Sequence, residues 1–294
     1  MPRVDGRIDH MAIDVAGQRL FVSALGNNTL EVIDVKNAKH LRTIAGLHEP
    51  QGVAYTPGAN RIFVANRADG SLRIYDGSSF ALVKTVAYGS DADNVRYDAQ
   101  ADRLWVGYGE GGLGTLDEGG TTIREIALGA HPESFQLEAH GPRIFVNLPP
   151  LHKIAVVDRQ SATAIASWPT DGATANYPMA LDEADHRLFV VCRHPARLLV
   201  LDTSTGKLIA SLPVVGDSDD LYYDAARKRI YAIGGEGAIS VFEQQEADHY
   251  RELARITTAP GARTGYFSPD LGRLFVASRR DGSQPAEILI YEVQ

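Results

Sequence analysis

The chain alternates short runs of apolar and β-branched residues with polar turns, and one of these runs recurs with little change. The recurring run is an arginine followed by Leu or Ile, an aromatic residue, and Val or Ala. It begins at Arg19, Arg61, Arg103, Arg143, Arg187, Arg229 and Arg273, so successive copies are 42, 42, 40, 44, 42 and 44 residues apart. A fixed period of this length is typical of an array of one repeated supersecondary unit. The sequence therefore predicts seven copies of one structural unit.

Each copy carries signals for three short strands, and most copies for a fourth. A β-rich run begins nine residues before every arginine, and a third apolar run ends on an acid, at Asp34, Asp76, Asp117, Asp158, Asp202, Glu243 and Glu292. A fourth run follows in most copies, for example at 40–45, 82–86, 123–128 and 208–214, and is rich in residues that favour strands. We therefore predict an all-β fold: a seven-bladed β-propeller of four-stranded antiparallel blades, forming a single domain over residues 1–294, with blades starting near residues 10, 52, 94, 134, 178, 220 and 264.

The two ends of the chain leave questions open. The last copy ends on its third strand near Val293, so either the first nine residues supply a fourth strand or this blade is one strand short. The N-terminus has neither the charged region nor the apolar stretch of an export signal. A precursor trimmed of such a signal would explain the abrupt start, so a processed periplasmic or secreted protein is one alternative and the compartment stays open.

Composition narrows the class of protein. With 294 residues, 44% of them hydrophobic, the chain can bury a large core without disulfides or metal ions. No segment approaches the roughly 20 consecutive apolar residues of a membrane-spanning helix, so we predict a soluble protein without membrane insertion. The net charge of −8 and the lack of a basic stripe argue against nucleic acid as a partner. The single cysteine, Cys192, is either a small buried residue or a nucleophile activated by Arg193 and His194.

Polar residues stand directly before the predicted first strands. They are Asp9, Gln51, Asp93, Glu133, Tyr177, Asp219 and Arg263. Because the first strand of a blade lies nearest the propeller axis, we predict that these side chains border a water-filled axial channel. Acids crowded around one axis repel one another unless a cation, an arginine or protonation relieves them. We therefore predict a divalent cation, calcium or magnesium, held by hard oxygen ligands from Asp93, Asn94, Glu133, Asp219 and Asp220. The alternative is an acidic vestibule that holds only water.

Two family resemblances add to this picture. The blade pattern, with runs such as Arg19–Asp34 and with Asn66 after Arg61-Ile-Phe-Val-Ala, resembles the YVTN-repeat β-propeller family over essentially the whole chain. That resemblance implies a seven-bladed propeller, often exported in bacteria, whose members range from binding proteins to lactonase-like enzymes. The phrase Ser218-Asp219-Asp220-Leu221 is similar to a strand of the regucalcin and gluconolactonase propellers. It implies a catalytic role for Asp219, with Glu133 and Asn94 among the cation ligands.

Other side chains offer further chemistry. The loop histidines His48, His131, His152 and His194 would suit zinc, copper or iron if they converged with His10. His10 or Asp219 could alternatively act as a general base. Residues predicted to bind a ligand are Arg263, Tyr177, Gln51, Arg67, Asn147, Arg193 and His194. The alternative for the arginines is pairing with neighbouring acids.

Together these features predict a propeller that binds a small polar or anionic molecule at the opening of its axial channel. Metal-assisted hydrolysis of a lactone or ester is the enzymatic form of this hypothesis. The competing hypothesis is a non-enzymatic scaffold whose loops contact a protein partner.

Overall fold

The computed structural model describes Met1 and residues 3–294, and almost all of its regular structure is β-strand. The described residues form seven antiparallel sheets, six with four strands and one with three. The predicted all-β, seven-bladed β-propeller is therefore confirmed. Residues 1–129 together with 265–294 form one compact unit, called unit 1, and residues 130–264 form unit 2. That the chain is a single domain stays a prediction.

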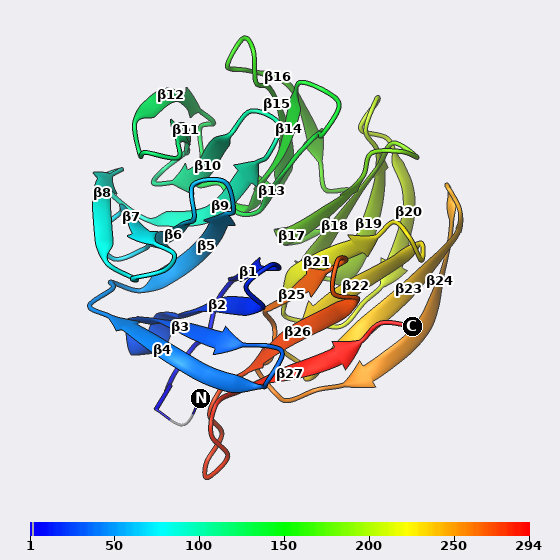
Figure 1. Ribbon diagram of the computed structural model, residues 1–294. Coiled ribbons are helices and arrows are strands. Elements are labelled where there is room, and N and C mark those ends of the chain that lie inside the picture. The colour runs from blue at the N-terminus through cyan, green and yellow to red at the C-terminus, as the bar shows by residue number, and fades with distance from the viewer. Residues whose placement is uncertain (2) are drawn as a thin grey trace. The chain divides into compact units, whose positions relative to one another are not determined.

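Unit 1 contains four of the sheets (Figure 1). The first sheet consists of β1 (Met11–Asp14), β2 (Arg19–Ala24), β3 (Thr29–Asp34) and β4 (Lys39–Ala45), with the short 3-10 helix η1 (Leu25–Asn27) between β2 and β3. The second consists of β5 (Pro50–Thr56), β6 (Arg61–Asn66), β7 (Ser71–Asp76) and β8 (Leu82–Ala87). The third consists of β9 (Ala92–Asp98), β10 (Arg103–Tyr108), β11 (Gly112–Asp117) and β12 (Thr122–Ala127), and the fourth of β25 (Gly265–Ser268), β26 (Arg273–Ser278) and β27 (Glu287–Glu292).

Unit 2 contains the other three sheets. The first consists of β13 (Phe135–Leu137), β14 (Arg143–Leu148), β15 (Lys153–Asp158) and β16 (Thr163–Pro169), with the 3-10 helix η2 (Pro149–Leu151) between β14 and β15. The second consists of β17 (Thr174–Asp182), β18 (Arg187–His194), β19 (Ala196–Asp202) and β20 (Leu208–Pro213). The third consists of β21 (Ser218–Asp224), β22 (Arg229–Gly234), β23 (Ala238–Glu246) and β24 (His249–Thr257).

The repeated arginine has a fixed place in the sheet register. In every sheet it opens the second strand directly opposite an acid of the third strand, as the pairs Arg19 with Asp34 and Arg61 with Asp76 illustrate. This acid is the last residue of its strand in all sheets but one, where β23 continues past Glu243 to Glu246. The carboxylate of Asp76 accepts the backbone N–H groups of Ser79 and Ser78, and Nη1 of Arg61 lies 2.7 Å from it. Chiefly because of the bonds from Ser79, the pKa of Asp76 is lowered to about 2. The acid thus holds the turn that follows its own strand.

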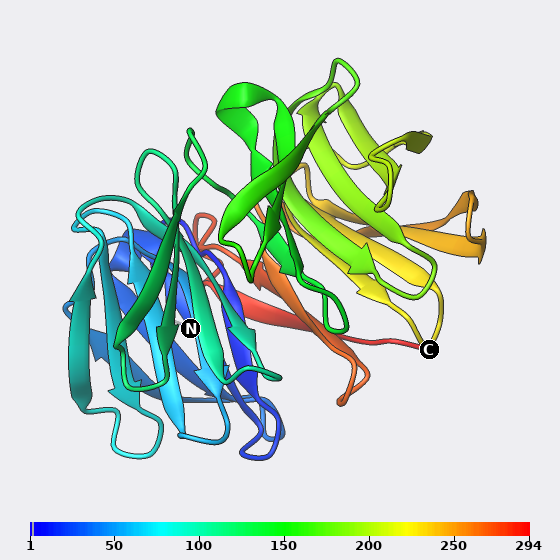
Figure 2. The ribbon, with the colours of Figure 1, turned by 90° about the horizontal axis from the view of Figure 1, so that it is seen from above.

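The aromatic residue of the repeated run lies in the core. The side chains of Phe21, Phe63, Phe145, Phe189 and Phe275 are all fully buried. The first strands contribute a second buried layer, from Met11, Val53, Val95, Phe135, Met179 and Leu221, as the sequence predicts. Consecutive sheets within each unit pack through these side chains, and Figure 2 shows the stacked sheets from above. The core thus accounts for the apolar positions of the repeat.

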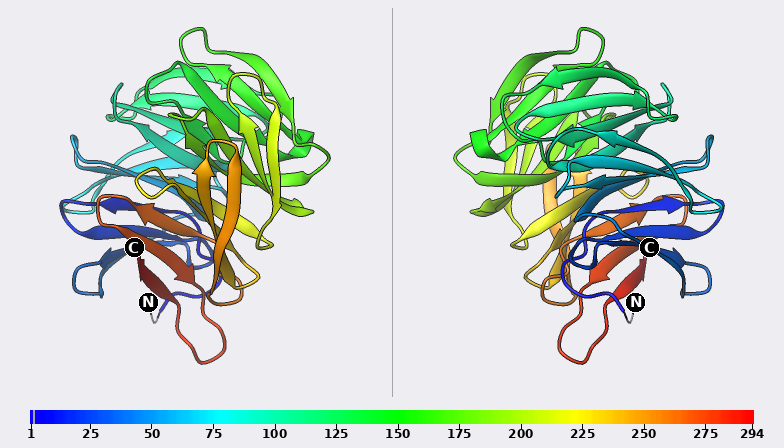
Figure 3. Two further views of the ribbon diagram at one scale, coloured as in Figure 1. Left: turned by 90° about the vertical axis from the view of Figure 1, so that its right-hand side faces the viewer. Right: turned by 90° about the vertical axis from the view of Figure 1, so that its left-hand side faces the viewer.

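The sheet that ends the chain is the one with three strands. The described residues before β1 add no fourth strand to it, so the blade has three strands where the others have four. Instead Val4 and Ile8 are buried in a cluster that includes Phe275 and Ala286. The N-terminal amino group donates a hydrogen bond to the carbonyl of Ala286 at 2.6 Å. Both chain ends lie in unit 1, where the loop between β26 and β27 projects from its sheet (Figure 3). Among the described residues, no helix is long and apolar enough to cross a membrane.

The first strands of unit 1 approach one another closely at Gly52. A Cβ atom on Gly52, in β5, would lie 2.0 Å from the carbonyl oxygen of Asp93 in β9. Backbone atoms cannot yield to such a contact without moving the strand. The absence of a side chain at position 52 therefore sets the spacing between the starts of β5 and β9.

We predict that Gly52→Ala destabilises the protein by about 1–3 kcal/mol, the usual cost of inserting an atom into a filled space. Gly58→Ala is the matched control, because a Cβ there would meet nothing within 4 Å. The free energy of unfolding of both variants would be measured by chemical denaturation. Equal stability of the two variants would contradict the close approach of β5 and β9.

Candidate ligand-binding site

The polar residues that precede the first strands are divided between the two units. Asp9, Gln51 and Asp93 belong to unit 1, whereas Glu133, Tyr177, Asp219 and Arg263 belong to unit 2. Within each unit the first strands of consecutive sheets contact one another, so their starts are neighbours. All seven residues are buried or half-buried. That all seven side chains border one axial channel would involve both units, so it stays a prediction.

In unit 2, two arginines converge on one aspartate. Arg193 lies near the end of β18, Asp219 near the start of β21, and Arg263 in the segment before β25. Nη2 of Arg193 lies 2.6 Å from Oδ1 of Asp219, and Nε of Arg263 lies 3.4 Å from Oδ2 of the same carboxylate. The Asp219 side chain is only 10% exposed. Its buried carboxylate is thus stabilised by two positive charges from different parts of the chain.

Asp217 completes this group. Its carboxylate accepts two hydrogen bonds from Nη1 of Arg263, at 2.9 and 3.2 Å, and lies 3.2 Å from Nη1 of Arg193. We call Arg193, Arg263, Asp217 and Asp219 the guanidinium–carboxylate cluster. It contains two positive and two negative charges, so it carries no formal net charge. Each guanidinium is held in a fixed orientation by acids, and the two Asp side chains are 40% and 10% exposed.

Tyr177 packs against this cluster. The guanidinium carbon of Arg193 lies 4.2 Å from the centre of the Tyr177 ring, a favourable cation–π distance. The carbonyl oxygen of Tyr177 accepts hydrogen bonds from Oγ of Ser134 at 2.6 Å and from Nδ2 of Asn147 at 2.9 Å. Nδ2 of Asn176 in turn donates to Oδ1 of Asn147 at 2.9 Å. Asn147 is fully buried, so in this structure it holds the strand that carries Tyr177.

The remaining predicted ligand-binding residues lie outside this cluster. Arg67, in unit 1, is exposed and lies within ion-pair distance of Glu49 and Asp91, at 3.3 and 3.5 Å. Gln51 is 7% exposed. His194 follows Arg193 at the end of β18 and is exposed. Arg67, Arg193 and Arg263 all pair with acids. The sequence offered such pairing as the alternative to ligand binding by these arginines.

Unit 1 holds a second polar group at the starts of β1 and β9. Nδ2 of Asn94 lies 3.5 Å from Nε2 of His10 and 3.5 Å from Oδ1 of Asp93. Nε2 of His10 lies 3.8 Å from the fully buried carboxylate of Asp9, which also pairs with Arg7 at 2.9 Å. Oδ1 of Asn94 is buried and has no hydrogen-bond partner among the residues that the structure describes.

The predicted metal ligands are divided between the units. Asp93 and Asn94 lie in unit 1, while Glu133, Asp219 and Asp220 lie in unit 2. Within either unit taken alone, no three described His, Cys, Asp or Glu side chains bring ligand atoms within 4.8 Å of one another. Of the candidate zinc or copper ligands, His10 and His48 belong to unit 1 and the other three histidines to unit 2. Nδ1 of His48 pairs with Asp69 at 2.7 Å. The predicted cation stays a hypothesis.

Comparison with known proteins establishes the fold and no more. The chain is similar to a solved structure of hydrazine synthase from Kuenenia stuttgartiensis, with 15% identity, a TM-score of 0.83, and coverage of 99% of this chain and 98% of that one. It is also similar to a chain of the mitotic checkpoint complex, with 13% identity, a TM-score of 0.78, and coverage of 95% and 90%. No protein-family model and no curated sequence matches. The resemblance to YVTN-repeat and regucalcin-type propellers therefore stays a prediction.

Cys192 has the environment of a core residue. Its side chain is fully buried, and this burial raises the pKa of the thiol to about 12. The neighbouring Arg193 directs its guanidinium at Asp219. The structure therefore favours the interpretation of Cys192 as a small buried residue.

We predict that Cys192 of the folded protein does not react with iodoacetamide at pH 8. With a pKa of about 12, only about one thiol in ten thousand would be ionised at that pH, and the thiolate is the reactive form. In guanidinium chloride the same thiol should be alkylated completely, which mass spectrometry would detect. Rapid alkylation of the folded protein would contradict the buried, un-ionised state.

Proposed function

We propose that this chain is a binding propeller that takes up a small polar or anionic molecule at the guanidinium–carboxylate cluster. The observation that carries the proposal is the convergence of Arg193 and Arg263 on Asp219, with Tyr177 packed against Arg193. Three of these residues are among the predicted ligand-binding residues, and Asp219 is the predicted catalytic one. They come from separate stretches of the chain, so the fold alone brings them together.

The geometry of the cluster indicates how a ligand would be held. The contacts of Arg263 engage its Nε and Nη1 atoms, so Nη2 can donate to a carboxylate, carbonyl or hydroxyl oxygen of a ligand. The carboxylates of Asp217 and Asp219 can accept hydrogen bonds from ligand hydroxyl groups. Because the acids already fix both guanidiniums, little side-chain entropy is lost when a ligand binds. A hydroxy acid, or its lactone, offers both kinds of oxygen.

A second candidate function is metal-assisted hydrolysis of a lactone or ester, and Asn94 is the observation that favours it. A buried amide oxygen without a partner is costly, and a cation would satisfy it. Asp93 and Asn94 would supply carboxylate and amide oxygens, which suit calcium or magnesium. A bound cation of this kind would polarise a substrate carbonyl. His10, beside Asn94, would then be placed to accept a proton.

The alternative function is of a different kind: a non-enzymatic scaffold that binds another protein. Propellers host many unrelated functions, so the fold is compatible with a protein partner. The similar chain from the mitotic checkpoint complex is part of a complex, which supports this alternative.

The binding proposal is tested by the variant Arg263→Gln. Titration calorimetry with a panel of hydroxy acids and lactones, including gluconate, malate and gluconolactone, should detect binding to the unaltered protein. Losing a charged hydrogen bond costs about 1.5–3 kcal/mol, so Arg263→Gln should weaken binding by roughly tenfold or more.

Arg251→Gln is the matched control, because Arg251 also pairs with an acid in unit 2 but lies on an exposed outer strand. Its affinity should equal that of the unaltered protein. The proposal fails if no member of the panel binds, or if Arg263→Gln binds as tightly as Arg251→Gln.

The metal-dependent candidate is tested by thermal melting. We expect millimolar calcium or magnesium to raise Tm by about 2 °C or more, because a ligand that binds only the folded state stabilises it. Asn94→Leu removes the unpartnered oxygen and should abolish this increase. Asn37→Leu, an exposed position, should retain it. If neither calcium nor magnesium changes the Tm of the unaltered protein, the proposed metal site is excluded.

A further inference from the structure

Unit 2 contains a pocket that none of the predicted chemistry uses. It lies where the first and second strands of the three sheets connect, the opposite end of these strands from the guanidinium–carboxylate cluster. Residues of the turns 138–143 and 181–186, together with Tyr223 and Ala225, line a volume of about 690 Å³. This volume is within the range of small-molecule sites. We call it the turn pocket.

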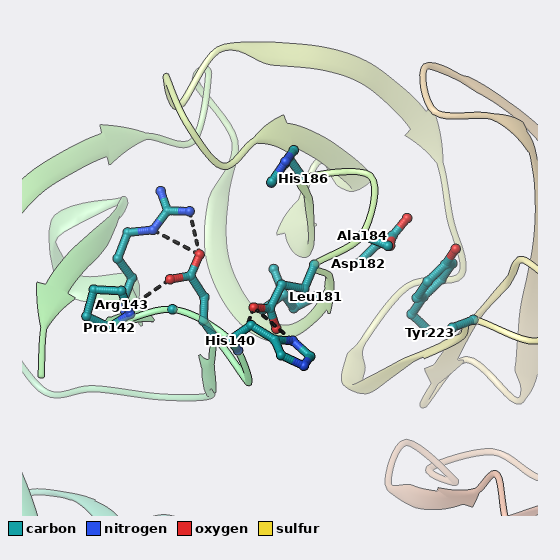
Figure 4. A pocket seen from close by; sticks show the side chains of 12 residues that line it. His140, Pro142, Arg143, Leu181, Asp182, Ala184, His186 and Tyr223 are labelled. Carbon is teal, nitrogen blue, oxygen red and sulfur yellow. Dashed lines mark hydrogen bonds and ion pairs between the residues drawn. The ribbon is translucent and has the colours of Figure 1, made fainter. Parts of the chain in front are cut away.

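The wall of the turn pocket is largely apolar. Pro142 and Leu181 contribute aliphatic surface, as do Ala184 and Ala225. Figure 4 shows Pro142 on one side of Leu181 and the ring of Tyr223 on the other. The Tyr223 hydroxyl donates a hydrogen bond to Gln244, which fixes the ring. An aliphatic chain lying here would cover surface that is otherwise exposed to water.

Three acids also line this pocket, and only one of them pairs with an arginine. Glu138 accepts hydrogen bonds from Nε and Nη2 of Arg143. Glu183 instead accepts the backbone N–H groups of Ala139 and His140, both at 2.7 Å, and its side chain is 26% exposed. These two donors are neutral, so they orient the carboxylate without cancelling its charge.

Asp182 is the third acid. It is 4% exposed and accepts hydrogen bonds from Nε2 of Gln244 at 3.0 Å and from the N–H of Asp185 at 3.2 Å. Among the described residues, no lysine or arginine forms an ion pair with Asp182 or Glu183. Nδ1 of the His140 imidazole lies 3.6 Å from the carboxylate of Glu183. The nearby Lys228 pairs with Asp185, at 3.8 Å. The pocket therefore combines an apolar wall with two carboxylates that lack a permanent positive partner.

We propose that the turn pocket binds a small organic cation, an ammonium group on an aliphatic chain. The ammonium group would form an ion pair with the carboxylate of Glu183 and would also be attracted by the negative charge of Asp182. The aliphatic chain of the ligand would cover Leu181 and the other apolar residues. Attraction between the ammonium group and the face of the Tyr223 ring would add to this. The proposal does not depend on the guanidinium–carboxylate cluster, because no residue is shared between the two sites.

The test compares 1,6-diaminohexane with 1,6-hexanediol, which has the same chain but no charge. Calorimetry on the full chain should detect binding of the diamine and none of the diol. Glu183→Gln should weaken diamine binding by about fivefold, the upper range for a partly exposed ion pair. Added salt should weaken it as well.

Two further variants complete the experiment. Ala184→Lys places an ammonium group of the chain itself at an exposed position of the pocket, and should abolish diamine binding. Glu246→Gln, an exposed acid elsewhere in unit 2, should bind like the unaltered protein. Far-UV circular dichroism would verify that each variant is folded. Absent diamine binding, equal binding of diamine and diol, or unchanged affinity in both Glu183→Gln and Ala184→Lys overturns the proposal.

Discussion

In each sheet the arginine that opens the second strand lies opposite an acid at or near the end of the third strand, so these two strands are paired in the same register throughout the repeat. The acid commonly accepts the N–H groups of its own turn, as Asp158 does from Gln160 and Ser161. In some sheets it also forms an ion pair with the arginine opposite, as Asp76 does with Arg61. A slip of one residue would move the whole apolar face of a strand to the wrong side of the sheet. The shared register therefore places the start of each first strand at the same position in the repeat.

Most of the fold could be predicted because this pairing is local in sequence. The arginine and its acid are 14 or 15 residues apart in most copies, close enough for the period to be visible without knowledge of the structure. The predicted fourth strand at 40–45 compares with β4 at Lys39–Ala45, and that at 208–214 with β20 at Leu208–Pro213. The last sheet could not be predicted in the same way. The sequence left two arrangements open there, and burial of Val4 and Ile8 gives the segment before β1 a packing role without a strand.

The candidate site was less predictable because its contacts join distant residues. Arg193 stands beside Cys192 in the sequence, yet its guanidinium lies 2.6 Å from Asp219, 26 residues further on. Asp217 was not singled out from the sequence, since a turn acid gives no sign of the two arginines that it contacts. Asn176 was missed for a similar reason, because its partner is another buried asparagine. Side chains that are adjacent in sequence indicate chemistry only when the fold also directs them to one place.

In unit 2, the acids at one end of the strands pair with arginines, whereas at the other end Asp182 and Glu183 pair with none of the described arginines. We expect this difference to determine the charge of the ligand that each end binds. Crowded acids can be relieved by a cation, an arginine or protonation. At the guanidinium–carboxylate cluster the relief comes from Arg193 and Arg263, so a further positive charge would gain little there, whereas Nη2 of Arg263 would favour an oxygen atom of the proposed ligand. At the turn pocket, Glu183 is held by neutral N–H groups, so its charge remains available. If both proposals hold, one repeated scaffold presents sites of opposite preference at the two ends of the same strands, because the partners of the acids differ while the fold does not.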